Sequence, residues 1–384
     1  MSASTNKPNI VIIGGGYAGL TAAQKLSSAL SNTHQILLIE KKSHFHHDIG
    51  GLRTIVEEGF EKKIIIPYDH IFDKHGDGKI IHGTVTRFKK NDLIVRKSNG
   101  QELKINFEIA VIATGSDYSR PAKFIGENKD DDVKEILEQR EALKKAQRVL
   151  IVGGGPVGIE LAGEIASVYG KEKEITLIHG KEELLTPKFP KKLKDSLATQ
   201  LKDLNVNLIL GDRIDFERYN VGNGLSKMTI TTEKGQTVES DIQFVAIGQK
   251  PNTSIIEQLN ADLIDENTHL VKVKSTLQLE LDEYDHIFAI GDITNIPESK
   301  LAFRAGLHGE LVGKNIVSYL TNKRLEEYKP VKEAMIITVG KNGGAGLLPI
   351  FNGLVIGSML TRNIKSKSLF VDKYWKMANA TPEK

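Results

Sequence analysis

Glycines at a fixed spacing are the residues that most clearly indicate chemistry. Gly14, Gly16 and Gly19 follow a continuous apolar run at residues 9–13, and apolar residues at helical spacing come after them. The next apolar run ends at Glu40, 21 residues beyond Gly19. In this context the glycines permit a tight turn, the approach of a pyrophosphate and close helix–strand packing. The pattern predicts a dinucleotide-binding loop, with the Glu40 carboxylate accepting hydrogen bonds from a ribose.

The same arrangement occurs a second time, 139 residues later. Gly153, Gly155 and Gly158 follow an apolar run at residues 148–152, and the next strand ends at His179, again 21 residues on. The chain is therefore predicted to hold two dinucleotide units. An acid at the position of His179 would favour NADH and repel a 2′-phosphate. The histidine leaves NADPH open, or it only caps the end of a strand.

Three further apolar runs end in small residues, which are Ala113-Thr114-Gly115, Gly248 and Gly291-Asp292. Each pattern alone is also typical of a buried strand that ends in a turn. In parallel sheets, ligands bind beyond the carboxyl ends of the strands. At such an edge, the Asp292 carboxylate is suited to accept hydrogen bonds from a ribityl chain.

The composition excludes several other chemistries. The 384 residues contain no cysteine, so disulfides, thiolate zinc sites, cysteine-held iron–sulfur clusters and cysteine nucleophiles are impossible. If this chain moves electrons, an organic cofactor must carry them. A net charge of +3 argues against strong nucleic-acid binding by charge. His46 and His47 are adjacent and lack the spacing of metal ligands, so no metal site is expected.

The order of these segments resembles that of a two-dinucleotide flavoprotein reductase over nearly the whole chain. More specific segments lie at residues 43–53, 58–63, 177–179 and 365–376. They resemble the AMID / ferroptosis suppressor protein family, which is related to apoptosis-inducing factor, over roughly residues 9–377. The resemblance implies an α/β fold with glutathione-reductase-like FAD and NAD(P) Rossmann-type domains and a C-terminal α+β region. It also implies an FAD-dependent NAD(P)H:quinone oxidoreductase.

The resemblance also implies roles for individual residues. FAD would be held by Gly14, Gly15, Gly16, Tyr17, Ala18, Gly19, Glu40, Lys41, Arg53, Val85, Ala113, Thr114, Gly115 and Asp292. NADH or NADPH would be held by Gly153, Gly155, Gly158, His179 and Gly248. The catalytic residues would be Lys123, Glu160, Lys365 and Phe370, the last two in the acceptor pocket. Arg53 would place its guanidinium near the pyrophosphate, although a surface ion pair is the ordinary alternative. Val85 would lie by the adenine.

The domain boundaries follow from the two loops. Residues 1–120 and 255–330 are expected to form a discontinuous FAD domain, with the NAD(P)H domain inserted at 140–250. The acids at 130–132 predict an exposed linker between them. Residues 331–384 form a third region, with strands at 335–339 and 354–356 and a glycine-rich loop at 343–346. Without a following helix, that loop is not interpreted as a third dinucleotide site.

The C-terminal region is also the candidate for membrane contact. Residues 361–384 carry six Lys/Arg against two Asp/Glu, together with Phe370, Tyr374 and Trp375. They suit a peripheral membrane segment or a tail packed against the protein body. The apolar run 347–360 favours a buried strand over an interfacial segment. With no signal peptide and with Ser2 excluding myristoylation, we expect a cytoplasmic protein, or one peripheral on the mitochondrial outer membrane or a lipid droplet.

Competing functions differ in the acceptor. The primary hypothesis is hydride transfer from NAD(P)H to flavin N5, followed by transfer of two electrons to a ubiquinone-like acceptor. One alternative is a reductase for a protein acceptor such as a ferredoxin. Another is a redox-signalling or DNA-binding flavoprotein like apoptosis-inducing factor. The sequence leaves the oligomeric state open.

Overall fold

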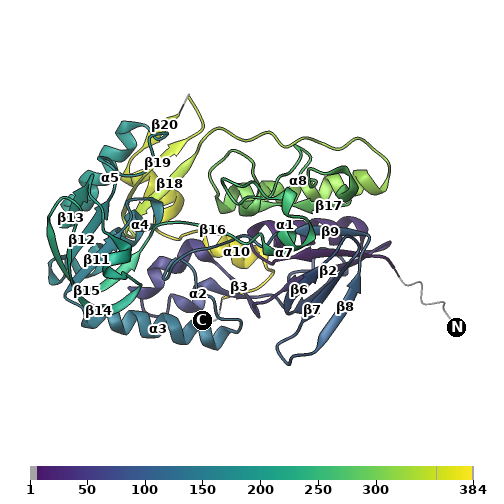
Figure 1. Ribbon diagram of the computed structural model, residues 1–384, viewed down its shortest axis with the longest axis horizontal. Coiled ribbons are helices and arrows are strands. Elements are labelled where there is room, and N and C mark those ends of the chain that lie inside the picture. Colours follow the sequence, from purple (N-terminus) through teal and green to yellow (C-terminus); the bar gives the residue numbers. More distant parts are fainter. Residues whose placement is uncertain (1–6, 352, 383–384) are drawn as a thin grey trace.

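The computed structural model describes residues 7–351 and 353–382, and Figure 1 shows that they form two lobes. Each lobe is built on a five-stranded sheet, and a three-stranded sheet from the C-terminal region lies against the second lobe. Both five-stranded sheets place parallel strands at the centre, where continuous apolar runs are buried on two faces.

The first lobe contains the first glycine loop. Its parallel sheet has the order β17-β9-β1-β2-β5, and Ile10 of β1 lies opposite Ile36 and Ile109. The strands are β1 (Asn9–Ile13), β2 (Gln35–Glu40), β5 (Lys79–His82), β9 (Ile109–Ile112) and β17 (Ile287–Ala289). Helices α1 (Tyr17–Leu30) and α8 (Ala302–Leu320) pack together beside this sheet. The helices approach closely because a Cβ on Gly309 would lie 2.6 Å from the carbonyl oxygen of Ala18.

The second lobe contains the second glycine loop. Its sheet has the order β13-β12-β11-β15-β14, parallel except for the edge strand β14. The strands are β11 (Arg148–Val152), β12 (Glu174–His179), β13 (Val206–Leu210), β14 (Gly224–Thr231) and β15 (Thr237–Val245). Its helices are α3 (Lys129–Lys145), α4 (Pro156–Tyr169) and α5 (Lys191–Asp203). The lobes are joined by the antiparallel pair β10 (Ser116–Asp117) and β16 (Lys250–Pro251).

Shorter elements complete the lobes. They are β3 (His44–His46), α2 (Glu61–Ile64), β4 (Ile65–Pro67), β6 (Thr84–Phe88), β7 (Asp92–Arg96), β8 (Glu102–Asn106), α6 (Phe216–Tyr219) and α7 (Ser254–Leu259). Strands β6, β7 and β8 form an antiparallel sheet beside the first lobe.

The C-terminal region packs against both lobes. Strands β18 (Met335–Val339), β19 (Gly343–Leu348) and β20 (Leu354–Ile356) lie beside α4 and α5, and their apolar residues join the second core. The chain continues through α9 (Ser358–Thr361) and a π-helical turn at Arg362–Ser366. Helix α10 (Val371–Met377) then joins the core of the first lobe. Figure 1 shows this yellow segment crossing from one lobe to the other.

The prediction of a glycine-rich loop at 343–346 is wrong, because these residues begin strand β19. A Cβ on Gly344 would lie 2.4 Å from the carbonyl oxygen of Ile337 and 2.6 Å from Thr361 Cγ2. These glycines therefore allow β18 and α9 to approach the strand, which is a packing reason rather than a turn-forming one.

The expected burial of the apolar run 347–360 is correct only in part. Leu347 and Ile356 are buried, whereas Phe351 is 89% exposed and Met359 is 78% exposed. By contrast, Tyr374 and Trp375 are buried in the first-lobe core, as expected of a tail packed against the protein body rather than of a membrane segment. No helix within the described residues is long and apolar enough to cross a membrane.

Candidate active site

The first glycine loop leaves open space in front of its backbone. Gly14 has a φ of +102°, and a Cβ there would lie 2.3 Å from the carbonyl oxygen of Ala113. A Cβ on Gly19 would lie 1.8 Å from the carbonyl oxygen of Gly14, so only glycine lets α1 pack this closely. For Gly16, no described atom lies within 4 Å of that position. The open backbone at a helix N-terminus fits a pyrophosphate.

Glu40 is tied to this loop by backbone hydrogen bonds. Its Oε2 accepts the N–H of Gly15 at 2.5 Å, and its Oε1 accepts the N–H of Lys42 at 2.8 Å. The Tyr68 hydroxyl donates to the carbonyl oxygen of Gly15 at 2.9 Å. The carboxylate is therefore fixed at the end of β2, with lone pairs left for ribose hydroxyls.

A cavity begins at this loop and extends to the second lobe. Most of the FAD-site and catalytic residues expected from the sequence line it, namely Gly14, Gly16, Tyr17, Ala18, Glu40, Lys41, Ala113, Thr114, Gly115, Lys123, Glu160, Asp292 and Lys365. Gly15 and Gly19 shape the loop without lining the cavity. This cavity fits an extended dinucleotide such as FAD. It combines open glycine backbone, the Glu40 carboxylate suited to ribose hydroxyls, and wall residues from both lobes.

Asp292 is held in this cavity by neighbouring polar groups. It follows β17, and its Oδ2 accepts hydrogen bonds from Ser116 Oγ at 2.7 Å and Gln249 Nε2 at 2.9 Å. Lys123 donates from Nζ to the carbonyl oxygen of Ser116 at 2.5 Å. The wall thus presents a pre-positioned carboxylate, suited to a polyol chain, and a nearby ammonium group.

An ion pair joins the second lobe to the C-terminal region at the far end of the cavity. Glu160 lies on the first turns of α4, and Lys365 lies in the π-helical turn. Lys365 Nζ donates to Glu160 Oε1 at 2.6 Å and to the carbonyl oxygen of Ile336 at 2.9 Å. Glu160 also accepts the N–H of Thr338 at 3.0 Å. A helix that begins at the second loop thus contributes a wall to the cavity of the first.

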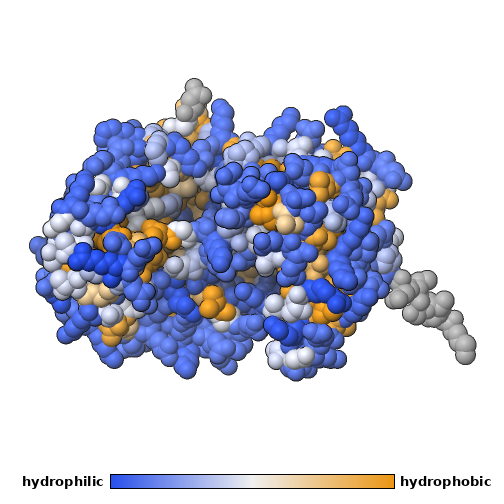
Figure 2. All heavy atoms as spheres, in the orientation of Figure 1, coloured by the Kyte–Doolittle hydropathy of each residue, from blue (hydrophilic) through white to orange (hydrophobic). Residues whose placement is uncertain are grey.

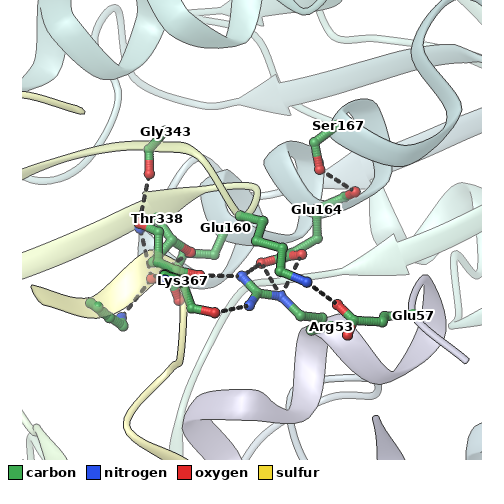
Figure 3. Close-up of polar contacts among 11 residues, drawn as sticks. Arg53, Glu57, Glu160, Glu164, Ser167, Thr338, Gly343 and Lys367 are labelled. Atoms are coloured by element: carbon green, nitrogen blue, oxygen red, sulfur yellow. Dashed lines mark hydrogen bonds and ion pairs between the residues drawn. The ribbon is translucent and has the colours of Figure 1, made fainter. Parts of the chain in front are cut away.

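The expected contact of Arg53 with a pyrophosphate stays a prediction; in this structure Arg53 is not among the described residues that line the cavity. Its buried guanidinium binds Glu164 through Nη2 at 2.7 Å (Figure 3). The same nitrogen donates to the carbonyl oxygen of Ser366 at 2.7 Å, and Nη1 donates to that of Lys367 at 3.4 Å. Burial raises the pKa of Glu164, and Arg53 opposes that rise. Arg53 therefore joins α4 to the segment that follows Lys365.

Two other expected site residues, Val85 and Phe370, lie outside the cavity wall as described. Val85 lies in β6 and packs against the first-lobe core, and Phe370 packs against the same core just before α10. Neither lines the cavity within the described part of the chain. Phe370 has a φ of +59° and, with Leu369, turns the chain into α10, which is anchored in the core. Apolar cavity residues come instead from Leu52, Val157 and Leu301.

The second loop repeats the geometry of the first. A Cβ on Gly153, whose φ is +120°, would lie 2.5 Å from the carbonyl oxygen of Ala246. A Cβ on Gly158 would lie 1.8 Å from the carbonyl oxygen of Gly153, whereas Gly155 has no described atom within 4 Å. Gly248, after β15, is similarly open and has a φ of +78°. This loop therefore fits a second pyrophosphate.

His179 ends β12 in the position that Glu40 has at the end of β2. Burial lowers the pKa of His179, and the neighbouring Lys181 and Arg213 cations lower it further. Its Nε2 has no hydrogen-bond partner among the described residues. A Cβ on Gly180 would lie 2.7 Å from Arg213 Nε, so the arginine lies across this strand end. Basic groups thus replace the acid of the first loop.

A buried histidine connects the first loop to the C-terminal region, and sequence reasoning missed it. His47 Nε2 donates to the carbonyl oxygen of Leu369 at 2.7 Å, which leaves Nδ1 to accept from the Tyr17 hydroxyl at 3.1 Å. Burial lowers the pKa of His47 to about 4, so the ring is neutral. The adjacent histidines were the available signal, but apart from their place in the family-like segment 43–53 they were interpreted only as possible metal ligands.

The acids at 130–132 begin helix α3 instead of forming a linker. Asp132 is buried and accepts hydrogen bonds from Lys42 Nζ at 2.7 Å and His44 Nε2 at 3.0 Å. Burial alone would raise the pKa of Asp132, but these two bonds lower it overall. Lys42 and His44 line the cavity, so α3 helps to position its wall.

Comparisons with known proteins agree with this architecture. The pyridine nucleotide-disulphide oxidoreductase family matches residues 8–308. Apoptosis-inducing factor homolog B of Dictyostelium discoideum is 34% identical, covering 98% of this chain and 98% of its own. Ferroptosis suppressor protein 1 of Taeniopygia guttata is also 34% identical, covering 97% of this chain and 96% of its own.

Solved structures share the fold at lower identity. The sulfide:quinone oxidoreductase of Aquifex aeolicus has a TM-score of 0.75 and 16% identity, covering 97% of this chain and 92% of its own. NDH2 from Plasmodium falciparum, in complex with NADH, has a TM-score of 0.72 and 15% identity, covering 98% of this chain and 100% of its own.

The family match and the relatives establish the class of enzyme. This chain is an FAD-dependent oxidoreductase that uses NAD(P)H. The 384 residues contain no cysteine, so they carry no redox-active disulphide of their own. The chain belongs to the pyridine nucleotide-disulphide oxidoreductase family and, within it, to the group of apoptosis-inducing factor homologs and ferroptosis suppressor proteins.

Proposed function

We propose that this chain is an NAD(P)H:quinone oxidoreductase, with FAD in the cavity at the first loop and the nicotinamide nucleotide at the second. The observation that carries this proposal is the shared wall formed by Glu160 and Lys365. Glu160 lies on the helix that begins at the second loop, yet it lines the cavity that begins at the first. Electron transfer between two bound nucleotides requires such a meeting point.

The residues of the chain have distinct roles in this reaction. FAD, when bound, supplies the centre that accepts a hydride and passes two electrons onward. The open backbone at Gly16 and Gly155 binds the two pyrophosphates, and Asp292 orients the ribityl chain. Lys365 holds a positive charge where negative charge develops on an acceptor oxygen. Glu160 keeps that ammonium group in position through the bond at 2.6 Å.

The cavity wall suits a quinone acceptor. The residues Leu52, Val157 and Leu301 are apolar, and Lys365 adds a cationic donor. Apolar side chains beside one cationic donor match a flat ring that carries carbonyl oxygens. Overall, NAD(P)H and one proton reduce the quinone to the quinol and leave NAD(P)+. One hydrogen of the quinol comes from the hydride of NAD(P)H and the other from the proton. No protein nucleophile takes part.

The test compares Lys365→Met with Lys341→Met in the FAD-loaded protein. Lys341 belongs to the same C-terminal region, but it is exposed and pairs with Glu57 at 3.4 Å. Loss of the cationic donor should lower the rate of soluble-quinone reduction by about 100-fold. Ferricyanide accepts single electrons without this donor, so its reduction should change much less. Stopped-flow absorbance separates flavin reduction from reoxidation.

The proposal predicts normal rates for Lys341→Met with both acceptors. Equal losses with quinone and ferricyanide in Lys365→Met would remove Lys365 from the quinone step. A wild-type protein that reduces ferricyanide but no quinone would contradict the quinone assignment. Such a protein would then require a different electron acceptor, such as a redox protein.

A further inference from the structure

Exposed apolar side chains gather in one part of the C-terminal region. Six large apolar residues are exposed within a stretch of fifteen residues, and we refer to them as the apolar surface. It comprises Ile350, Phe351, Leu354, Met359, Leu360 and Ile364. Figure 2 shows hydrophobic residues on the protrusion that Figure 1 places at the β19–β20 turn.

The six residues form two groups, one at each end of β20. One group lies at the β19–β20 turn and the start of β20, and the other lies on α9 and the turn after it. Strand β20 has three residues and therefore spans about 10 Å between them. Helix α9 packs against β19, with Thr361 beside Gly344. The two groups are thus held on a rigid sheet rather than on a free tail.

The net charge around the apolar surface is positive. Residues 334–371 contain the cations Lys341, Arg362, Lys365 and Lys367 and no aspartate or glutamate. Helix α5, which packs against β19, adds four lysines against two aspartates. Lys341 is paired with Glu57, but Arg362 and Lys367 are exposed. Exposed apolar side chains beside cations match a layer of anionic headgroups over hydrocarbon.

We propose that the apolar surface docks on a bilayer that contains anionic lipids. Phe351 and Met359 would enter the headgroup–acyl boundary, and Arg362 and Lys367 would contact lipid phosphates. Ile364 is exposed, whereas its neighbour Lys365 lines the cavity. A membrane-dissolved acceptor would therefore reach the cavity wall within one residue of the docked surface. The benefit of docking for acceptor access rests on the proposed function, but membrane binding itself is tested without any turnover.

The experiment measures sedimentation of the FAD-loaded full chain with vesicles. One set of vesicles contains phosphatidylcholine alone, and the other also contains phosphatidylserine. The variant Phe351→Ser/Met359→Ser is compared with Leu137→Ser/Leu225→Ser. These control residues are exposed apolar side chains on α3 and β14 of the second lobe. All proteins are first tested for flavin reduction by NADPH and for ferricyanide reduction, which should match those of the wild type.

We expect the wild type to bind phosphatidylserine vesicles and to dissociate as salt is raised. Phe351→Ser/Met359→Ser should bind at least about 10-fold more weakly, because two inserted apolar side chains are lost. The control should bind like the wild type. No vesicle binding, or equal binding by both variants, would overturn the proposal.

A second copy of the chain is the competing occupant of this surface. If a second copy covers this surface, light scattering would show a dimer that dissociates in Phe351→Ser/Met359→Ser. The wild type would then not bind vesicles. This pair of results would also overturn the proposal. Failure of the proposed function leaves a different pattern, in which vesicles bind but no quinone is reduced. The two hypotheses are therefore separately falsifiable.

Discussion

At the scale of single residues, Arg53 shows what the sequence cannot supply. Its neighbours in the chain indicated a phosphate contact, but its ionic partner Glu164 lies 111 residues away. Glu40 was easier to place, because its distance from the first loop is set by one helix and one strand. Local spacing therefore predicts residues at strand ends, whereas long-range ion pairs depend on how separate elements pack.

Arg53 is predicted to position Lys365 without touching any ligand. Arg53→Met alone leaves the buried Glu164 carboxylate unpaired and should cost about 3–5 kcal/mol of stability. Arg53→Met/Glu164→Gln removes that unpaired charge and should recover most of the stability. The double variant still lacks the donors that hold the carbonyl oxygens of Ser366 and Lys367. We therefore expect about 10-fold slower quinone reduction, with flavin reduction by NADPH unchanged.

The stability of the double variant is measured by urea unfolding and its two half-reactions by stopped flow. Arg53→Lys serves as the control, since it keeps a buried cation without the forked geometry. Recovered stability together with wild-type quinone rates would show that Arg53 has only a structural role.

His47 is predicted to make the protein less stable in mild acid. Its pKa is about 4 in the folded chain and about 6.5 when unfolded. Between these values the unfolded state binds more protons, so stability falls as pH falls. From pH 7.5 to pH 5, this single group should cost about 2 kcal/mol of unfolding free energy.

Urea midpoints of the wild type and His47→Gln at both pH values provide the measurement for His47. Glutamine keeps a donor and an acceptor but does not titrate in this range. The variant should therefore lose about 2 kcal/mol less than the wild type on acidification. Identical pH dependence in the two proteins would mean that His47 is not the responsible group.

At the scale of elements, both strand–loop–helix units could be predicted, because each depends on contacts close in sequence. The open positions at Gly16 and Gly155 confirm that the two loops have the same shape. Strand β19 could not be predicted in this way. Its glycines are required by the approach of β18 and α9, which the local sequence does not reveal.

The end of β12 is predicted to favour NADPH over NADH. Lys181 and Arg213 lie near His179, where an acid would otherwise repel a 2′-phosphate. Lys181→Ala/Arg213→Ala should raise the KM for NADPH about 10-fold and leave the KM for NADH nearly unchanged. Steady-state kinetics with ferricyanide measures both values. The matched control is Lys227→Ala, an exposed lysine of β14 in the same lobe. A proportional rise for both nucleotides would contradict the prediction.

At the scale of the whole molecule, the C-terminal region packs against both lobes and lines the cavity between them. Its sheet packs on the second lobe, its last helix packs in the first, and Lys365 lies between them at the cavity wall. The family resemblance indicated that this region serves the acceptor, and Lys365 does line the cavity. It did not indicate which aromatic residues are buried, because burial of α10 depends on packing against both lobes.

The central claim is that electrons pass from NAD(P)H to a quinone through one cavity. The most direct test is anaerobic double-mixing stopped flow on the FAD-loaded wild type. NADPH is added first, and a water-soluble ubiquinone analogue is added once the flavin absorbance has bleached. We predict rapid bleaching, followed by rapid recovery of the oxidised spectrum with one quinol formed per flavin. Bleaching that persists in the presence of quinone would contradict the account.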